Sequence, residues 1–170
     1  MKRMSVKIDT DSLAFLVSDC ARLMRMAFER RILSAGLELT AGEARTLVQI
    51  AAHNGSRQLD IATRMGLEPM TVSAFLDRLQ MRGLIERQPD PLDRRAKRIM
   101  LSDAAEEMIR AISVEIVAVQ NEATNGLDRE AQDDVRHALK CFRQNLQKCD
   151  PLALGREADP IVVVKADSIC

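Results

Sequence analysis

Two short helical stretches separated by a tight glycine turn constrain the fold of this chain more than any other feature. Residues 58–65 have helical apolar spacing and end at Gly66, and residues 69–82 form a second such stretch. Pro69 suits the first position of a helix, where its missing N–H has no partner to lose. Two short helices joined by a turn that contains glycine are typical of a helix-turn-helix. This pattern alone is weak evidence, because many helical proteins contain it.

The segment that follows these helices makes the assignment more specific. Residues 84–88 and 97–101 have the composition of two short strands. The residues between them, 89–96, contain two prolines and two aspartates, which favour turns and cannot continue a strand. A β-hairpin directly after a helix-turn-helix predicts a winged helix-turn-helix, in which the hairpin loop is the wing.

The rest of the chain is predicted to be helical. It has no Trp, no Tyr and four Phe, whereas β-sandwiches and barrels usually rely on more aromatic residues. One long helix is expected over about residues 10–34. Thr40 and Glu43 have the spacing of a capping box for the next helix, and Ser102 is expected to cap a later one. We therefore expect a mainly α fold with a small β-hairpin wing.

Three helices carry more apolar surface than the small winged lobe can cover. They are the first helix, a helix after Ser102 and a last helix after Asn125–Gly126. A second copy of the chain is the simplest way to bury these faces, so we expect a homodimer. The expected organisation is an N-terminal dimerisation helix (1–36), a winged helix-turn-helix lobe (37–102), C-terminal dimerisation helices (103–149) and an extension (150–170) that is loose or packed on the partner subunit.

Charge is distributed unevenly although the formal net charge is zero. Residues 78–98 contain seven basic and three acidic side chains, whereas residues 102–135 contain nine acidic and two basic ones. Positive charge concentrated on the second helix and the wing is what neutralisation of DNA phosphates requires. The acidic helices should lie away from a nucleic acid.

Composition and motifs exclude several other classes of protein. With 46% hydrophobic and 29% charged residues the chain is an ordinary globular protein, and no apolar run is long enough to span a membrane. The first residues lack the apolar core of a secretory signal, so we expect a cytoplasmic protein. The four cysteines form no metal-binding cluster, and nothing in the sequence indicates catalysis. We expect neither a metal, nor a cofactor, nor an enzymatic activity.

Three segments together resemble the MarR family of winged helix-turn-helix transcriptional regulators. They are residues 66–73 (GLEPMTVS), 77–87 (DRLQMRGLIER) and 89–102 (PDPLDRRAKRIMLS). The similarity covers about Leu13 to Leu146, and the wing sequence Asp93-Arg94-Arg95 is its most diagnostic part. The resemblance implies a homodimer that binds a pseudo-palindromic duplex, usually as a repressor that a small aromatic acid, a phenol or cysteine oxidation releases from DNA.

The resemblance also implies roles for individual residues. The helix from Pro69 would lie in the major groove, where Met70 contacts a thymine methyl and Thr71 and Ser73 form hydrogen bonds. Arg95 would enter the minor groove, held by the charge-assisted hydrogen bond that its guanidinium donates to Asp93. The remaining predicted contacts with phosphate or bases are made by Gln58, Arg78 and Arg94.

A small-molecule pocket is implied between the dimerisation helices and the DNA-binding lobe. Its predicted lining is Met24, Arg25, Phe28, Ala51 and His53, with Arg25 as the partner for a carboxylate. For each of these residues taken singly, core packing or solvent exposure is the alternative role.

Two other functions remain open at this stage. A winged helix can dock another protein without binding DNA, since a fold does not fix a function. A thiol-based redox sensor would use Cys20, which is near the region where some family members carry a reactive cysteine. The apolar stripe around Cys20 instead predicts a small buried hydrophobic side chain.

Overall fold

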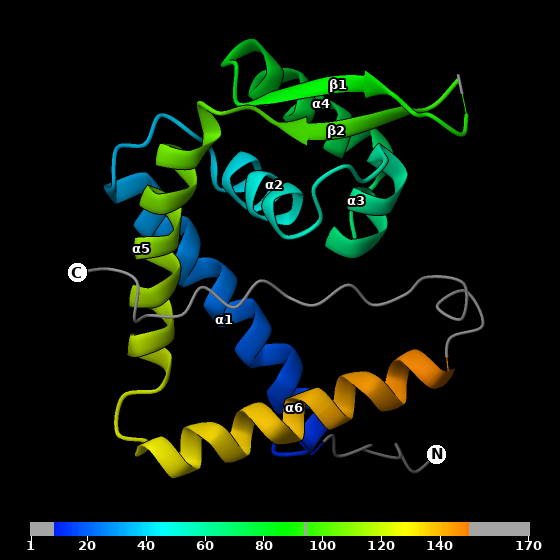
Figure 1. The fold of residues 1–170 in the computed structure, drawn as a ribbon. Coiled ribbons are helices and arrows are strands. Elements are labelled where there is room, and N and C mark those ends of the chain that lie inside the picture. Colours follow the sequence, from blue (N-terminus) through cyan, green and yellow to red (C-terminus); the bar gives the residue numbers. More distant parts are fainter. Residues whose placement is uncertain (1–8, 94, 150–170) are drawn as a thin grey trace, which may run out of the picture.

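The computed structural model describes residues 9–93 and 95–149 as six helices and a two-stranded antiparallel hairpin. The predicted fold class is confirmed. In Figure 1 the hairpin and three short helices form a lobe at the top, and three longer helices form a base beneath it. The elements in chain order are α1 (Leu13–Ser34), α2 (Ala41–Ala52), α3 (Gln58–Met65), α4 (Pro69–Met81), β1 (Ile85–Pro89), β2 (Lys97–Leu101), α5 (Ala105–Ala123) and α6 (Arg129–Cys149).

The lobe has an aliphatic core between α2, α4 and the hairpin, and the ends of α1 and α5 extend this core into the base. Apolar residues at helical spacing on each helix turn inward, which is the pattern that predicted these helices. The largest fully buried side chains are Ile32, Leu47, Ile50, Ile61, Val72, Leu76, Leu79, Ile85, Ile99 and Ile112.

The capping box at the start of α2 is confirmed. The Thr40 side chain accepts a hydrogen bond from the backbone N–H of Glu43 at 3.2 Å, and the Glu43 carboxylate accepts one from the backbone N–H of Thr40 at 2.8 Å. These bonds satisfy N–H groups that have no partner within the helix. The start of α2 is therefore fixed by its own sequence.

The predicted Ser102 cap is wrong. Helix α5 begins three residues later, at Ala105, with Ala104 as its N-cap. The Ser102 hydroxyl instead donates to the carbonyl oxygen of Gly83 at 2.5 Å. Because the end of β2 lies beside the end of α4, this carbonyl competes successfully for the hydroxyl.

The hairpin pairs Ile85 with Leu101 at one end and Pro89 with Lys97 at the other. The segment before α3 adds to the outer side of β2: the Gly55 N–H donates to the Ile99 carbonyl at 2.9 Å, and the Ile99 N–H donates to the Ser56 carbonyl at 2.9 Å. The hairpin is therefore attached on both sides, to α4 by the chain and to the segment before α3 by hydrogen bonds.

The base is built differently from the lobe. Helix α1 packs on α5, and Arg31 joins them by ion pairs with Glu115 (2.9 Å) and Glu122 (2.6 Å). Helix α6 crosses the N-terminal end of α1, whose Val17 lines a hollow with Leu139 and Phe142 of α6 (Figure 1). Helix α6 has no buried residue, although one of its faces is apolar. Cys20, which was predicted to be buried, is exposed on α1 in this single chain. None of the described helices is both long and apolar enough to cross a membrane.

Candidate nucleic-acid interface and adjoining cavity

The exposed face of α4 carries three of the residues that the sequence assigned to base contacts. Met70 is 81% exposed, Thr71 is exposed and Ser73 is half-buried. Pro69 stands at the first position of the helix, as predicted. The Gln58 amide nitrogen donates to the Pro69 carbonyl oxygen at 3.2 Å, so this side chain links α3 to the start of α4.

Arg78 lies farther along α4, but its guanidinium is bound within the lobe. Its Nε donates to the buried carboxylate of Glu43, and its guanidinium stacks over the Phe75 ring, 5.4 Å from the ring centroid. Burial raises the pKa of Glu43, but the hydrogen bonds from Thr40 and Arg78 outweigh it, so the pKa lies below its ordinary value. Arg78 therefore fixes α4 against the start of α2, a position that the sequence could not reveal.

The wing loop is organised by aspartates. The Asp93 carboxylate accepts a hydrogen bond from the backbone N–H of Arg95 at 3.0 Å and lies 4.0 Å from the Arg57 guanidinium. The predicted bond between Asp93 and the Arg95 guanidinium is absent from the described structure, because the carboxylate is used to close the turn. Arg95 itself is exposed. Arg94 lies outside the described residues.

Asp90 is a site residue that sequence reasoning treated only as a turn former. Its side chain is 1% exposed, and one oxygen accepts from Arg57 at 2.8 Å and from Arg98 at 3.2 Å. The other oxygen accepts from the backbone N–H of Leu92 at 2.8 Å. The hydrogen bond from Arg57, followed by that from Leu92, holds the pKa of Asp90 well below its ordinary range. A carboxylate between two prolines in a charged loop was the available signal, but its partner Arg57 lies 33 residues earlier in the chain.

These ion pairs distinguish the basic residues of the lobe from one another. Arg78 pairs with Glu43 and Arg98 with Asp90, as described above. In addition, Arg87 is bound to Asp77 at 2.7 Å and Arg82 lies 3.7 Å from Glu38. Arg95 and Lys97 have no ion pair with any residue that the structure describes. Cations free of internal partners are the ones best able to neutralise a phosphate. Among the described basic residues of α4 and the hairpin, those without an ion pair thus lie at the wing.

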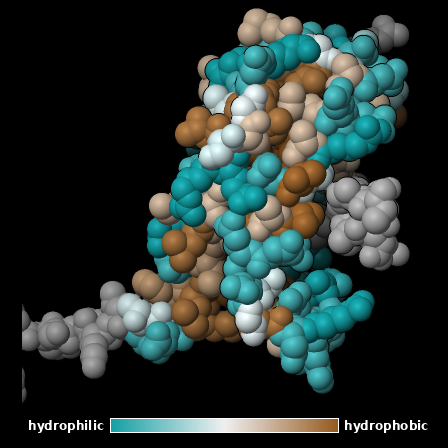
Figure 2. Space-filling view, turned by 90° about the vertical axis from the view of Figure 1, so that its left-hand side faces the viewer, coloured by the Kyte–Doolittle hydropathy of each residue, from teal (hydrophilic) through white to brown (hydrophobic). Residues whose placement is uncertain are grey.

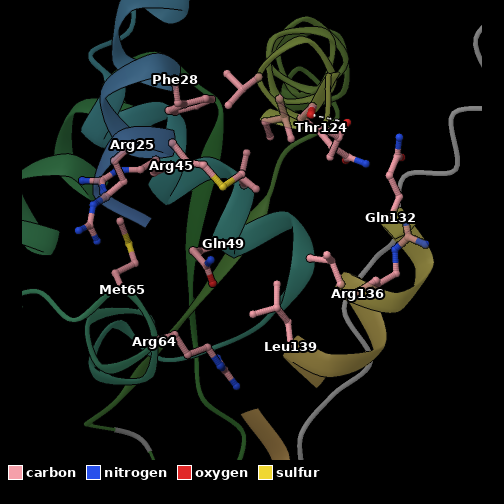
Figure 3. A pocket seen from close by; sticks show the side chains of 16 residues that line it. Arg25, Phe28, Arg45, Gln49, Arg64, Met65, Thr124, Gln132, Arg136 and Leu139 are labelled. Carbon is pink, nitrogen blue, oxygen red and sulfur yellow. Dashed lines mark hydrogen bonds between the residues drawn. The ribbon is translucent and has the colours of Figure 1, made fainter. Parts of the chain in front are cut away.

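A cavity of about 590 Å³ opens between the lobe and the base. Three of the five predicted pocket residues line it, namely Met24, Arg25 and Phe28. Ala51 is not among the lining residues, and His53 lines a smaller polar hollow beneath the wing. Figure 3 shows the side chains that α1, α2, α3, α5 and α6 direct around the cavity. The residues missed from the sequence include Arg45, Arg64 and Arg136, because they come from three different helices.

Comparison with known proteins agrees with this architecture. Residues 39–97 match the model of the MarR family. A crystal structure of MarR has a TM-score of 0.71 and 23% identity, and the match covers 85% of this chain and 97% of that one. The transcriptional regulator PA3341 is 28% identical with a TM-score of 0.69, over 81% of this chain and 99% of its own.

A third similar structure was solved with a small molecule. CouR from Rhodococcus jostii RHA1, bound to p-coumaroyl-CoA, has a TM-score of 0.65 and 24% identity, over 81% of this chain and 95% of its own. The match to the family model covers most of the lobe and the hairpin, and the structural matches extend through the base. Residues 39–97 therefore match the MarR family, and the winged helix-turn-helix fold of the chain is similar to that of solved MarR-family transcriptional regulators.

Proposed function

We propose that this protein binds duplex DNA as a homodimer and represses transcription, with α4 in the major groove and Arg95 in the minor groove. The observation that carries the proposal is an exposed Arg95 guanidinium, without a partner among the described residues, on a wing beside a helix whose outer face is accessible. A narrow minor groove concentrates negative potential and attracts such a group. The role is one of binding, and no catalytic step is assigned.

The dimer is supported by apolar side chains that nothing in a single chain covers. On α6, Val135, Leu139 and Leu146 are each about half exposed, and on α1 Leu13 and Leu16 are similarly exposed. In the face shown in Figure 2, hydrophobic side chains gather on the lower part of the molecule, below the lobe. Uncovered apolar faces of this kind mark interfaces with another chain. Residues 1–36 and 103–149 would then join two copies, and residues 37–102 of each would contact one half-site of a pseudo-palindrome.

DNA binding is tested by titrating the purified protein against its own upstream DNA at two salt concentrations. Affinity should fall steeply with salt, because neutralised phosphates release counterions. Arg95→Ala should weaken binding and reduce the magnitude of the salt slope by about one for each copy of the wing that engages DNA. Arg110→Ala, a solvent-exposed residue on α5, is the matched control. A salt-independent affinity, or equal effects of the two variants, would contradict the proposal.

The dimer is tested on α6 with two substitutions that introduce the same residue on opposite faces. Leu146→Glu places a charge on the apolar face and should shift the protein to monomers in sedimentation velocity. Lys140→Glu alters the opposite, polar face and should leave the dimer intact. If both variants sediment as the unmodified protein does, α6 is not part of a dimer interface.

We further propose that a small aromatic or phenolic effector in the cavity between lobe and base releases the protein from DNA. The support is the cavity itself and the likeness to CouR, whose structure contains p-coumaroyl-CoA. A ligand that binds the folded state raises its melting temperature, so thermal-shift measurements with aromatic acids and phenols test for such an effector. Release is then measured by adding any stabilising compound to the protein–DNA complex.

A further inference from the structure

The cavity between the lobe and the base has a strongly one-sided charge. Arginines from four helices line it: Arg25 from α1, Arg45 from α2, Arg64 from α3 and Arg136 from α6. The lining contains no Asp and no Glu. Guanidinium groups attract carboxylates and phosphates and bind them through paired hydrogen bonds. A neutral ligand would leave this positive charge unused.

Arg45 is the most informative of the four. Its Nε is buried and has no hydrogen-bond partner among the described residues. A buried donor without an acceptor costs free energy, and folded proteins rarely leave one unsatisfied. Arg25 also has no hydrogen bond or ion pair with any residue that the structure describes. Figure 3 shows the guanidinium groups of Arg25 and Arg45 on the same side of the cavity. An anionic group of a ligand would supply the missing acceptors.

The other two arginines lie elsewhere around the cavity. In Figure 3 Arg136 stands on the side opposite Arg25 and Arg45, and Arg64 lies below. Arg136 pairs with Asp133, and Arg64 donates to the Ser56 hydroxyl at 2.9 Å. Each guanidinium has five N–H donors, so these bonds leave donors for a ligand. The positive charge is therefore available at more than one point around the space.

Apolar side chains fill the lining between these charges. They are Met24, Phe28, Val48, Met65, Ile116, Val119, Val135 and Leu139. A cavity of about 590 Å³ is within the size range of sites that bind small organic ligands. An inorganic anion would leave this apolar surface in contact with water.

We infer that the cavity binds an organic molecule with an apolar body and at least two separate negative groups, one of which is held by Arg25 and Arg45. This inference rests on the proposed effector role and narrows it, because a neutral phenol lacks the anionic group that would bind the unpaired Arg25 and Arg45 guanidiniums. Such a ligand contacts the lobe through Arg45 and Arg64 and the base through Arg25 and Arg136. It therefore joins the lobe to α6, and its binding biases the orientation of the lobe relative to the dimer helices.

The test measures ligand binding by calorimetry without DNA, using the full chain. Three probes share one apolar body: decanedioate, decanoate and dimethyl decanedioate. Decanedioate should bind most tightly and the neutral diester least, with roughly a tenfold or greater gain for each charge-assisted contact. Equal affinities for the three probes, or binding by none of them, would overturn the inference.

Variants then locate the anion site. Arg45→Met keeps an unbranched apolar stem and should weaken decanedioate binding about ten- to a hundredfold, as expected for loss of hydrogen bonds to a charged group. Arg45→Lys retains the charge and should have a smaller effect. Arg110→Met, on the exposed side of α5, should leave the affinity unchanged. Equal losses in Arg45→Met and Arg110→Met would refute the assignment, and circular dichroism confirms that each variant is folded.

The same preparations separate this inference from the proposed DNA-binding function. Binding of decanedioate together with failure to bind any upstream DNA would contradict the DNA-binding role and support the anion site. Salt-dependent DNA binding, together with equal affinities for the three probes, would support the DNA-binding role and contradict the anion site.

Discussion

The contact between Gly42 of α2 and Phe75 of α4 sets how closely the proposed recognition helix approaches the lobe. A Cβ atom on residue 42 would lie 2.4 Å from Cζ of Phe75 and 2.8 Å from its Cε1. The ring has little freedom to move away, because the Arg78 guanidinium stacks over it and is itself bound to Glu43. Gly42→Ala is therefore expected to push α4 away from α2.

The size of the effect follows from two opposing contributions. Alanine is a better helix former than glycine by about 0.8–1.0 kcal/mol in a helix interior, and by less near a helix start such as this one. Overpacking a well-packed core costs about 1–3 kcal/mol. We expect Gly42→Ala to lower the free energy of unfolding by about 1–2 kcal/mol, which is roughly 3–6 °C in melting temperature for a chain of this size.

Denaturant unfolding followed by circular dichroism measures this change. All variants are compared at one protein concentration, because the stability of a dimer depends on concentration. The matched control is the same substitution in a Phe75→Leu background, where the ring atoms that clash are gone. There Gly42→Ala should be neutral or slightly stabilising, so the double-mutant cycle should give a coupling of at least about 1 kcal/mol. A stabilised single variant, or the same cost in both backgrounds, would refute the reasoning. The DNA affinity of Gly42→Ala should be lower than that of the unmodified protein. The affinity of the double variant should return toward that of Phe75→Leu alone.

Three further perturbations test the other contacts of the lobe. Asp90→Asn removes the charge that holds Arg57 and Arg98. This variant should bind DNA more weakly, and its wing should be cleaved faster by a protease while the α-helical content is unchanged. An unaltered rate of wing cleavage would argue against an anchoring role of Asp90. Because the pKa of Glu43 lies below its ordinary value of 4.5, its contribution to stability is complete above that value and is lost as the pH falls through the lowered pKa. The stability difference between the unmodified protein and Glu43→Gln should therefore shrink on acidification below pH 4.5, and a pH-independent difference would contradict this assignment. Thr40→Ala removes the cap of α2 and should cost about 1 kcal/mol in denaturant unfolding, whereas an unchanged midpoint would show that the capping box contributes nothing.

The elements that the sequence predicted correctly are those encoded by neighbouring residues. Periodic apolar spacing, the Thr40–Glu43 box, Pro69 at a helix start and the prolines of the wing each act over a few positions, so their consequences follow from the local chain. The hairpin and the order of the helices followed in the same way. Ser102 was the exception, because its hydroxyl had a competing acceptor, the Gly83 carbonyl, that only the packing of β2 against α4 brought within reach.

The partners of the charged residues were decided by tertiary structure. The sequence placed positive charge on the second helix and the wing, but it could not show that Arg78 is bound to Glu43 and Arg98 to Asp90, while Arg95 keeps no ion pair among the described residues. Ion pairs form between groups that the fold brings within a few ångströms, and their separation along the chain carries no information about that distance. For the same reason three of the four cavity arginines went unrecognised, since each lies on a different helix and only the packed structure makes them neighbours.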